Sequence, residues 1–188
     1  GVLLINPKGD SRRWQRYQVV PNFQSEESLL QDVDGDGRPE LAVSANNALG
    51  YYKYDPADPT KAWTFHAVSE AGYGVAHGIG VGDVNGDKRN DLLNCYGWWE
   101  QPASGDKWTY HPEAFGWYSR SSLGGTQMYT YDVNGDKLND VLAVMSAHGF
   151  GIAWFEQKRD SAGKISFVQH PIMGGEGGAS TSTTVVPG

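Results

Sequence analysis

Long apolar segments, cysteine pairs and basic clusters are all scarce in this sequence. It has no run of about 18 apolar residues, so we expect no membrane-spanning helix. Its single cysteine, Cys95, excludes an internal disulfide, and its strand-like neighbours predict a small buried residue. Lysine and arginine total 15 against 22 acidic residues and form no stripe that would neutralise phosphates. We therefore expect neither a membrane span nor a nucleic-acid partner.

The signatures of common catalytic and phosphate-binding motifs are also missing. The sequence has no Gly-x-Ser-x-Gly elbow, no His-Glu-x-x-His pair and no phosphate loop. The glycines within 72–82 do not form a Gly-x-Gly-x-x-Gly pattern, and an acidic loop follows them rather than a helix. These absences exclude the activities that such motifs indicate.

Glycine is abundant, with 25 of 188 residues, and it is part of a nine-residue stretch that the chain carries three times. The copies begin at Asp32, Asp83 and Asp132, and each has oxygen-bearing side chains at positions 1, 3, 5 and 9. Short acceptors at alternating positions of a tight turn point toward one centre, where a hard cation offsets their mutual repulsion. About six to eight oxygen ligands are typical of Ca²⁺. The repeat therefore predicts about three Ca²⁺ ions.

Two other interpretations of these loops fit the sequence less well. Asp, Asn and Gly favour surface turns in any case, but ordinary turns do not repeat four acceptors in register. An EF-hand needs a Glu at position 12 and a helix on each side. Position 12 is Val43, Asn94 or Ala143, and the short apolar segments after the loops predict strands. Calcium loops between strands remain the preferred interpretation.

Each loop belongs to a unit of about fifty residues that predicts four strands. One segment precedes the loop, and an apolar, an aromatic and an edge-like segment follow it. Four strands with the motif at constant phase predict an all-β fold of propeller blades, about three and a half of them, each four-stranded and antiparallel. The predicted boundaries are a half blade at 1–22, blades at about 23–70, 71–115 and 116–173, and a Gly/Ser/Thr-rich tail or start of a further blade at 174–188.

Closed propellers have about four to eight blades. We therefore expect this chain to be part of a larger propeller. Its partners would be the remaining blades of a longer chain or a second copy of this one.

The pattern Asp-x-Asp/Asn-x-Asp-x-x-x-Asp/Glu before an apolar strand resembles the FG-GAP/VCBS-type calcium-binding repeats of β-propellers, over nearly the whole chain. The resemblance implies that each loop joins the first two strands of a blade and holds calcium. A backbone carbonyl of Arg38, Arg89 or Leu138 would complete each ligand set. The implied side-chain ligands are Asp32, Asp34, Asp36 and Glu40, then Asp83, Asn85, Asp87 and Asp91, then Asp132, Asn134, Asp136 and Asp140.

Position 6 departs from the family pattern in two loops. It is usually Gly, as at Gly37, but Lys88 and Lys137 stand there in the second and third copies. If that position requires a positive φ, a non-Gly residue costs roughly 1 kcal/mol. We therefore expect the second and third loops to bind calcium more weakly.

The formal charge of −7 originates in the loops, which contain ten of the 22 acidic residues. Three calcium ions would bring it to −1, so the acidity belongs to the metal sites. No signal peptide is recognisable in this chain. Loops of this kind saturate at extracellular calcium levels, and we therefore expect the mature form of an exported protein, extracellular or periplasmic.

The five histidines fall into two groups. His77 precedes the second loop on an innermost strand, and His148 lies at a turn between strands. With Glu26, Tyr129 and Tyr131 they are candidates for an acid–base or metal-binding cluster at the mouth of the central channel. Scattered polar residues in a wet channel are the alternative. The others recur at one phase of the fourth strand and are predicted to be structural: His66, His111 and His170.

Aromatic residues give a candidate ligand site. Trp117, Tyr118 and Arg120 lie in an insertion at 113–125 that interrupts the repeat, so we predict a recognition loop there, suited to stacking on sugar rings. Tryptophans at fixed blade phase are instead predicted to fill the gaps between blades: Trp63, Trp99, Trp108 and Trp154. The first predicted function is a calcium-stabilised binding or interaction module, with a carbohydrate or another protein as partner.

The alternative function is enzymatic. Residues 97–103 and 146–157, together with the acidic loops, are similar to the propeller region of aldos-2-ulose dehydratase-like proteins. That resemblance implies a metal-dependent sugar lyase or dehydratase with its active site at the channel mouth. A metal other than calcium at His77 or His148 would favour the enzyme, whereas distant or core-packed histidines would exclude it.

Overall fold

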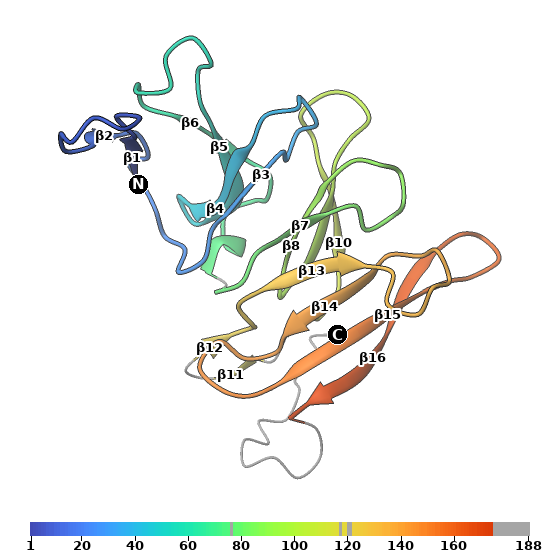
Figure 1. Cartoon of the computed structure of the whole chain (residues 1–188). Coiled ribbons are helices and arrows are strands. Elements are labelled where there is room, and N and C mark those ends of the chain that lie inside the picture. Colours follow the sequence, from blue (N-terminus) through green and yellow to red (C-terminus); the bar gives the residue numbers. More distant parts are fainter. Residues whose placement is uncertain (76, 117, 120–121, 175–188) are drawn as a thin grey trace.

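The computed structural model describes residues 1–75, 77–116, 118–119 and 122–174, and its extended elements are all β-strands (Figure 1). The exception is one short 3₁₀ turn, η1 (Tyr73–Val75). No helix among these residues has the length and apolar character to cross a membrane. The predicted all-β fold class is confirmed.

Three four-stranded antiparallel sheets, here called blades 1 to 3, follow one another along the chain, and in each the strand order in space is the order in sequence. Blade 1 contains β3 (Leu29–Gln31), β4 (Glu40–Ala45), β5 (Ala48–Lys53) and β6 (Thr64–Ala67). Blade 2 contains β7 (Gly80–Gly82), β8 (Asp91–Asn94), β9 (Gly97–Glu100) and β10 (Thr109–Pro112). Blade 3 contains β13 (Met128–Tyr131), β14 (Asp140–Val144), β15 (Ile152–Arg159) and β16 (Ile165–Met173).

Two smaller sheets complete the fold. β1 (Val2–Ile5) pairs with β2 (Gln15–Gln18) before blade 1, and this pair is here called the half blade. β11 (Tyr118–Ser119) pairs with β12 (Ser122–Leu123) within the predicted insertion. The sequential strand order is that of propeller blades, and Figure 1 shows the three blades side by side in chain order. The exact boundaries between blades stay predictions.

The hydrophobic core lies between the blades, because adjacent residues of a strand point to opposite faces of its sheet. On β5, Tyr52 packs with Val19 and Val20 after the half blade, while Tyr51 packs with residues of blade 2. The aromatic pair of β9 repeats this division: Trp99 faces blade 1 and Trp98 faces blade 3. Each gap between neighbouring blades is thus filled by side chains of both.

The innermost strands of blades 2 and 3 approach closely. A bridge joins Ile79 to Gln127, and the Ile79 amide donates to the Thr126 carbonyl at 3.2 Å. A Cβ atom added at Gly82 would lie 1.9 Å from Thr130 Oγ1, so this contact requires glycine on β7.

The outward face of blade 3 differs from the equivalent faces of blades 1 and 2. Val33 and Val84, at position 2 of the first two loops, are fully buried by the following blade. Val133, at the same position of the third loop, is 39% exposed, and Tyr129 and Tyr131 on β13 are 53% and 65% exposed. A further blade of the kind predicted would cover these side chains.

This difference gives a matched pair of substitutions. Val84→Ala removes packed methyl groups from the gap between blades 2 and 3 and is expected to lower the free energy of unfolding by about 2 kcal/mol. Val133→Ala is expected to change it by less than about 0.5 kcal/mol, because the side chain is already in contact with solvent. Urea unfolding followed by tryptophan fluorescence measures both. Equal losses for the two variants would contradict the packing between blades described here.

Candidate metal centres

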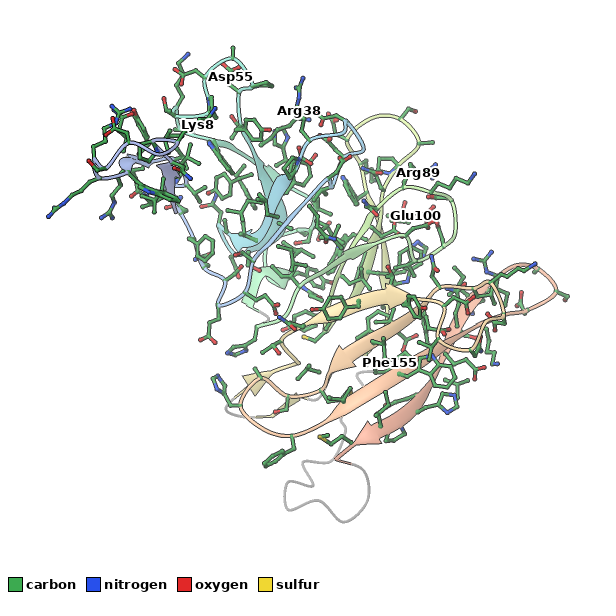
Figure 2. The ribbon with its side chains drawn as sticks, viewed as in Figure 1. Lys8, Arg38, Asp55, Arg89, Glu100 and Phe155 are labelled. Carbon is green, nitrogen blue, oxygen red and sulfur yellow. The ribbon has the colours of Figure 1, made fainter. Side chains whose placement is uncertain are left out.

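All three acidic loops connect the first strand of a blade to the second. They link β3 to β4, β7 to β8, and β13 to β14, and position 9 is the first residue of the second strand. The strand carries this carboxylate into the sheet, so Glu40, Asp91 and Asp140 are fully buried. Figure 2 places Arg38 and Arg89, at position 7 of the first two loops, in neighbouring loops on the same side of the molecule.

The aspartate at position 1 organises the turn. Asp32 Oδ1 accepts from the Gly35 amide at 2.8 Å, and Oδ2 accepts from the Gly37 amide at 2.9 Å. Equivalent bonds from positions 4 and 6 recur in the other loops, at Asp83 with 2.7 and 2.9 Å and at Asp132 with 2.7 and 3.0 Å. The side chains at positions 3 and 5 also accept from amides two residues later. These bonds fix the loop in a shape that turns the acceptors inward.

Position 6 has a positive φ in every copy: 84° at Gly37, 70° at Lys88 and 73° at Lys137. Position 6 therefore has the positive φ that favours glycine, and each lysine there costs roughly 1 kcal/mol relative to glycine. Whether the second and third loops bind calcium more weakly stays a prediction.

The hydrogen-bond partners of the buried position-9 carboxylate differ between the first loop and the other two. One oxygen of each accepts from the position-2 amide: Glu40 Oε2 at 2.9 Å, Asp91 Oδ2 at 2.8 Å and Asp140 Oδ2 at 3.0 Å. The second oxygens of Asp91 and Asp140 accept from the Gln101 and Gln157 amides, at 3.0 and 2.8 Å. Glu40 Oε1 is buried and has no hydrogen-bond partner among the described residues.

The first loop therefore fits a hard divalent cation best. Oxygen atoms of Asp32, Asp34 and Glu40 lie within 4.8 Å of one another. Glu40 also carries the buried Oε1 atom that has no hydrogen-bond partner among the described residues. A buried acceptor without a donor is costly, and a cation would satisfy it. The other two loops have Asn at position 3, whose amide donates to the position-5 aspartate: Asn85 to Asp87 at 3.0 Å and Asn134 to Asp136 at 3.1 Å.

Sequence reasoning missed a set of side-chain amides that link the first and second loops to the following blade. Asn90 Nδ2 donates to the Asp32 carbonyl at 2.7 Å, and Asn139 Nδ2 donates to the Asp83 carbonyl at 2.6 Å. Gln101 Nε2 donates to the Val33 carbonyl at 2.9 Å, and Gln157 Nε2 to the Val84 carbonyl at 2.8 Å. The available signal was the recurrence of Asn at position 8 and of Gln two residues after an aromatic pair.

A second group brings Glu26, His77 and His148 together from three different blades or their connections. Their potential ligand atoms lie within 4.8 Å of one another. His77 Nε2 is 3.9 Å from Glu26 Oε1, and the two imidazole rings are 5.0 Å apart and perpendicular. His77 Nδ1 is buried and has no hydrogen-bond partner in the described part of the chain. Tyr129 does not join them; its hydroxyl is 3.1 Å from Gln127 Oε1, to which it donates.

The other three histidines lie on the fourth strands and stack on aromatic rings of the third strands. The ring centroids are 5.2 Å apart for His66 and Tyr51, 4.0 Å for His111 and Trp98, and 4.5 Å for His170 and Trp154. His111 Nε2 is 2.8 Å from Glu100, and His170 Nε2 is 2.9 Å from Glu156. This packing agrees with the structural role predicted for them. Of the predicted recognition residues, Trp117 and Arg120 lie outside the described residues, and Tyr118 begins β11.

Burial raises the pKa of the Asp91 carboxyl to about 7. Hydrogen bonds from the Gln101 and Val84 amides lower this pKa, but their effect is smaller than that of burial. In metal-free protein this group therefore adds stability that is fully present below its ordinary pKa near 3.8 and is lost as the pH rises through 7. A bound cation reverses the preference, because it favours the ionised carboxylate.

We expect calcium affinity of the second loop to fall as the pH is lowered below 7, with proton uptake by Asp91. Carbonyl-carbon NMR titration of the Asp91 side chain, with and without calcium, measures both states. The metal-free pKa of Asp91 is expected to be about 7. A metal-free value near 4 would contradict the burial effect.

The comparison with known families covers part of the chain. Residues 32–93, about a third of the sequence, match the family model described as FG-GAP-like repeat. No curated protein matches the sequence. The FG-GAP part of the resemblance is supported by this match, whereas the likeness to VCBS repeats and to aldos-2-ulose dehydratase-like proteins stays a prediction. The segment from the first acidic loop into β8 is thus similar to an FG-GAP-like repeat, and it lies in an array of propeller-type blades.

Proposed function

We propose that this chain is a calcium-stabilised β-propeller interaction module of an exported protein, with a carbohydrate as its ligand. The observation that carries the proposal is the unpartnered Glu40 Oε1, buried in a loop where Asp32 and Asp34 place further carboxylate oxygens nearby. An FG-GAP-like repeat at this position supports an interaction module of the propeller type.

Calcium would supply positive charge and further coordination to the loop oxygens, beyond the main-chain amides that already donate to them. The protein's own part is to hold those oxygens in place. Asp32 directly follows β3 and Glu40 begins β4, so an ion shared by both would tie the first two strands of the blade together. The side-chain amides of Asn90 and Gln101, from blade 2, donate hydrogen bonds to backbone carbonyls of the same loop. Filling the loop would therefore also stabilise the contact between the blades.

A groove beside the first loop supports the ligand class. It has a volume of about 820 Å³ and lies between blades 1 and 2, with Tyr51, Arg89, Gln101 and Trp108 among its lining residues. Sugars are bound by planar polar groups that hydrogen-bond their hydroxyls and by aromatic faces that stack on their rings. The groove offers both kinds of side chain.

Calcium is expected to raise the melting temperature, because an ion that binds only the folded state stabilises it by mass action. At about 100 times the dissociation constant, one site contributes about 2.7 kcal/mol. Differential scanning calorimetry in calcium and in EGTA measures the shift, and isothermal titration counts the ions. Asp83→Ala should remove one ion and part of the shift, whereas the control Asp10→Ala, outside the loops, should remove neither. An unchanged melting temperature in EGTA would contradict the proposal.

A metal-dependent sugar lyase or dehydratase is the second candidate, and the Glu26–His77–His148 group favours it. Two imidazoles and one carboxylate form a ligand set for divalent first-row metals, with positions left open for substrate. A metal held there would act as a Lewis acid on a sugar carbonyl. The unpartnered Nδ1 of His77 agrees with a ligand role for this side chain.

This candidate predicts a metal site that is separate from the acidic loops. In the presence of excess calcium, one Co²⁺ per chain is expected to give visible absorption bands, and His77→Ala and His148→Ala should each weaken its binding at least tenfold. His111→Ala is the control, because that histidine stacks on Trp98 and contacts Glu100. Cobalt binding that survives both substitutions, or that His111→Ala weakens equally, would rule out the site.

A further inference from the structure

The third strand of each blade carries a charged residue directly after its aromatic pair. This residue is Lys53 in blade 1, Glu100 in blade 2 and Glu156 in blade 3. The equivalence follows from the register, since Tyr51, Trp98 and Trp154 all stack on the histidine of the fourth strand. The same structural position therefore carries opposite charges in different blades.

The charge at this position changes together with position 3 of the loop. Where position 3 is Asp34, the strand residue is Lys53; where it is Asn85 or Asn134, the strand residue is glutamate. The contacts explain the relation. Lys53 Nζ forms ion pairs with Asp34 and with Asp36, the latter at 2.6 Å. Glu156 Oε1 instead accepts from Asn134 Nδ2 at 3.0 Å.

We propose that Lys53 is a built-in counter-ion of the first loop and that its ammonium group competes with calcium for Asp34 and Asp36. This inference rests on the proposed calcium binding by the loops. The ammonium group neutralises part of the charge of four carboxylates when no ion is bound. Calcium must displace it to reach both carboxylates, so the first loop fills at a higher calcium concentration than its four acidic residues alone would give.

The pair is strong enough to matter because it is partly shielded from water. The Lys53 side chain is 30% exposed, and the two aspartates are exposed to a similar or smaller extent. Isolated exposed pairs contribute little, whereas one partly shielded ammonium held between two carboxylates contributes more. We expect the competition to weaken calcium binding by the first loop about tenfold. The glutamates of blades 2 and 3 add negative charge beside their loops and cannot compete in this way.

The three loops can be followed separately in one protein. The amides of Gly37, Lys88 and Lys137 each donate to the position-1 aspartate of their own loop, so their NMR signals report on each site. Lys53→Met keeps the apolar stem and removes the charge. It is expected to lower the calcium midpoint of the Gly37 signal about tenfold and to leave the other two midpoints unchanged.

Two controls separate charge from general effects. Lys53→Arg keeps a cation beside the carboxylates and should leave the Gly37 midpoint within about threefold of the wild-type value, in contrast to Lys53→Met. Lys61→Met removes an exposed ammonium that pairs with Asp58, at 3.7 Å, outside the loops. It should leave all three midpoints unchanged. In metal-free protein, Lys53→Met should also lower the melting temperature, which Lys61→Met should not.

The outcomes distinguish this inference from the proposed function. If all three amides respond to calcium and the Gly37 midpoint is the same in Lys53→Met and wild type, the inference is overturned and calcium binding stands. If none of the amides responds to calcium in the wild-type protein, both are overturned. A midpoint shift of equal size in all three loops would mean a general change in charge, and it would also overturn a role specific to Lys53.

Discussion

The burial of one carboxylate per blade is the constraint on which the rest of this structure depends. Glu40, Asp91 and Asp140 each begin a strand whose apolar residues fill the core. The carboxylate is therefore buried together with these apolar residues. Burying an ionisable group is costly unless donors or a cation accompany it. The main-chain amides of the acidic loops provide part of that compensation, which explains why the loops have the same shape in all three blades.

The compensation also crosses from blade to blade. The Gln101 and Gln157 amides complete the buried Asp91 and Asp140 carboxylates, while their side chains hold the loop of the preceding blade. A single residue thus joins the acidic loop of its own blade to that of the preceding blade. Beside these glutamines, Trp98, Trp99 and Phe155 fill the gaps between sheets. Core packing and loop geometry are therefore coupled, and neither is expected to change alone.

The sequence predicted the features that repeat in it. Acceptors at alternating positions, apolar strands after the loops and aromatic pairs at fixed phase depend on neighbouring residues, so they can be recognised without coordinates. The sequence also named His77, His148 and Glu26 as one candidate group, and the structure places their potential ligand atoms within 4.8 Å of one another, whereas Tyr129 of the same group donates to Gln127 instead. The pairing of Lys53 with Asp34 depends on the β4–β5 hairpin, where Asn46 and Asn47 both have positive φ. Contacts that cross between blades could not be read from one repeat.

The side-chain amides that link neighbouring blades donate backward along the chain: those of Asn90 and Gln101 to the first loop, and those of Asn139 and Gln157 to the second. Blades 2 and 3 offer these side-chain amides to loop carbonyls of the preceding blade, so this set of contacts has a direction along the chain. Blade 1 does not carry the backward-facing donors, since Pro39 and Tyr54 stand where the other blades have asparagine and glutamine. The repeats are consequently not interchangeable modules: a circular permutation that moved blade 1 behind blade 3 would bring a proline, which has no amide to donate, against the carbonyl of Asp132.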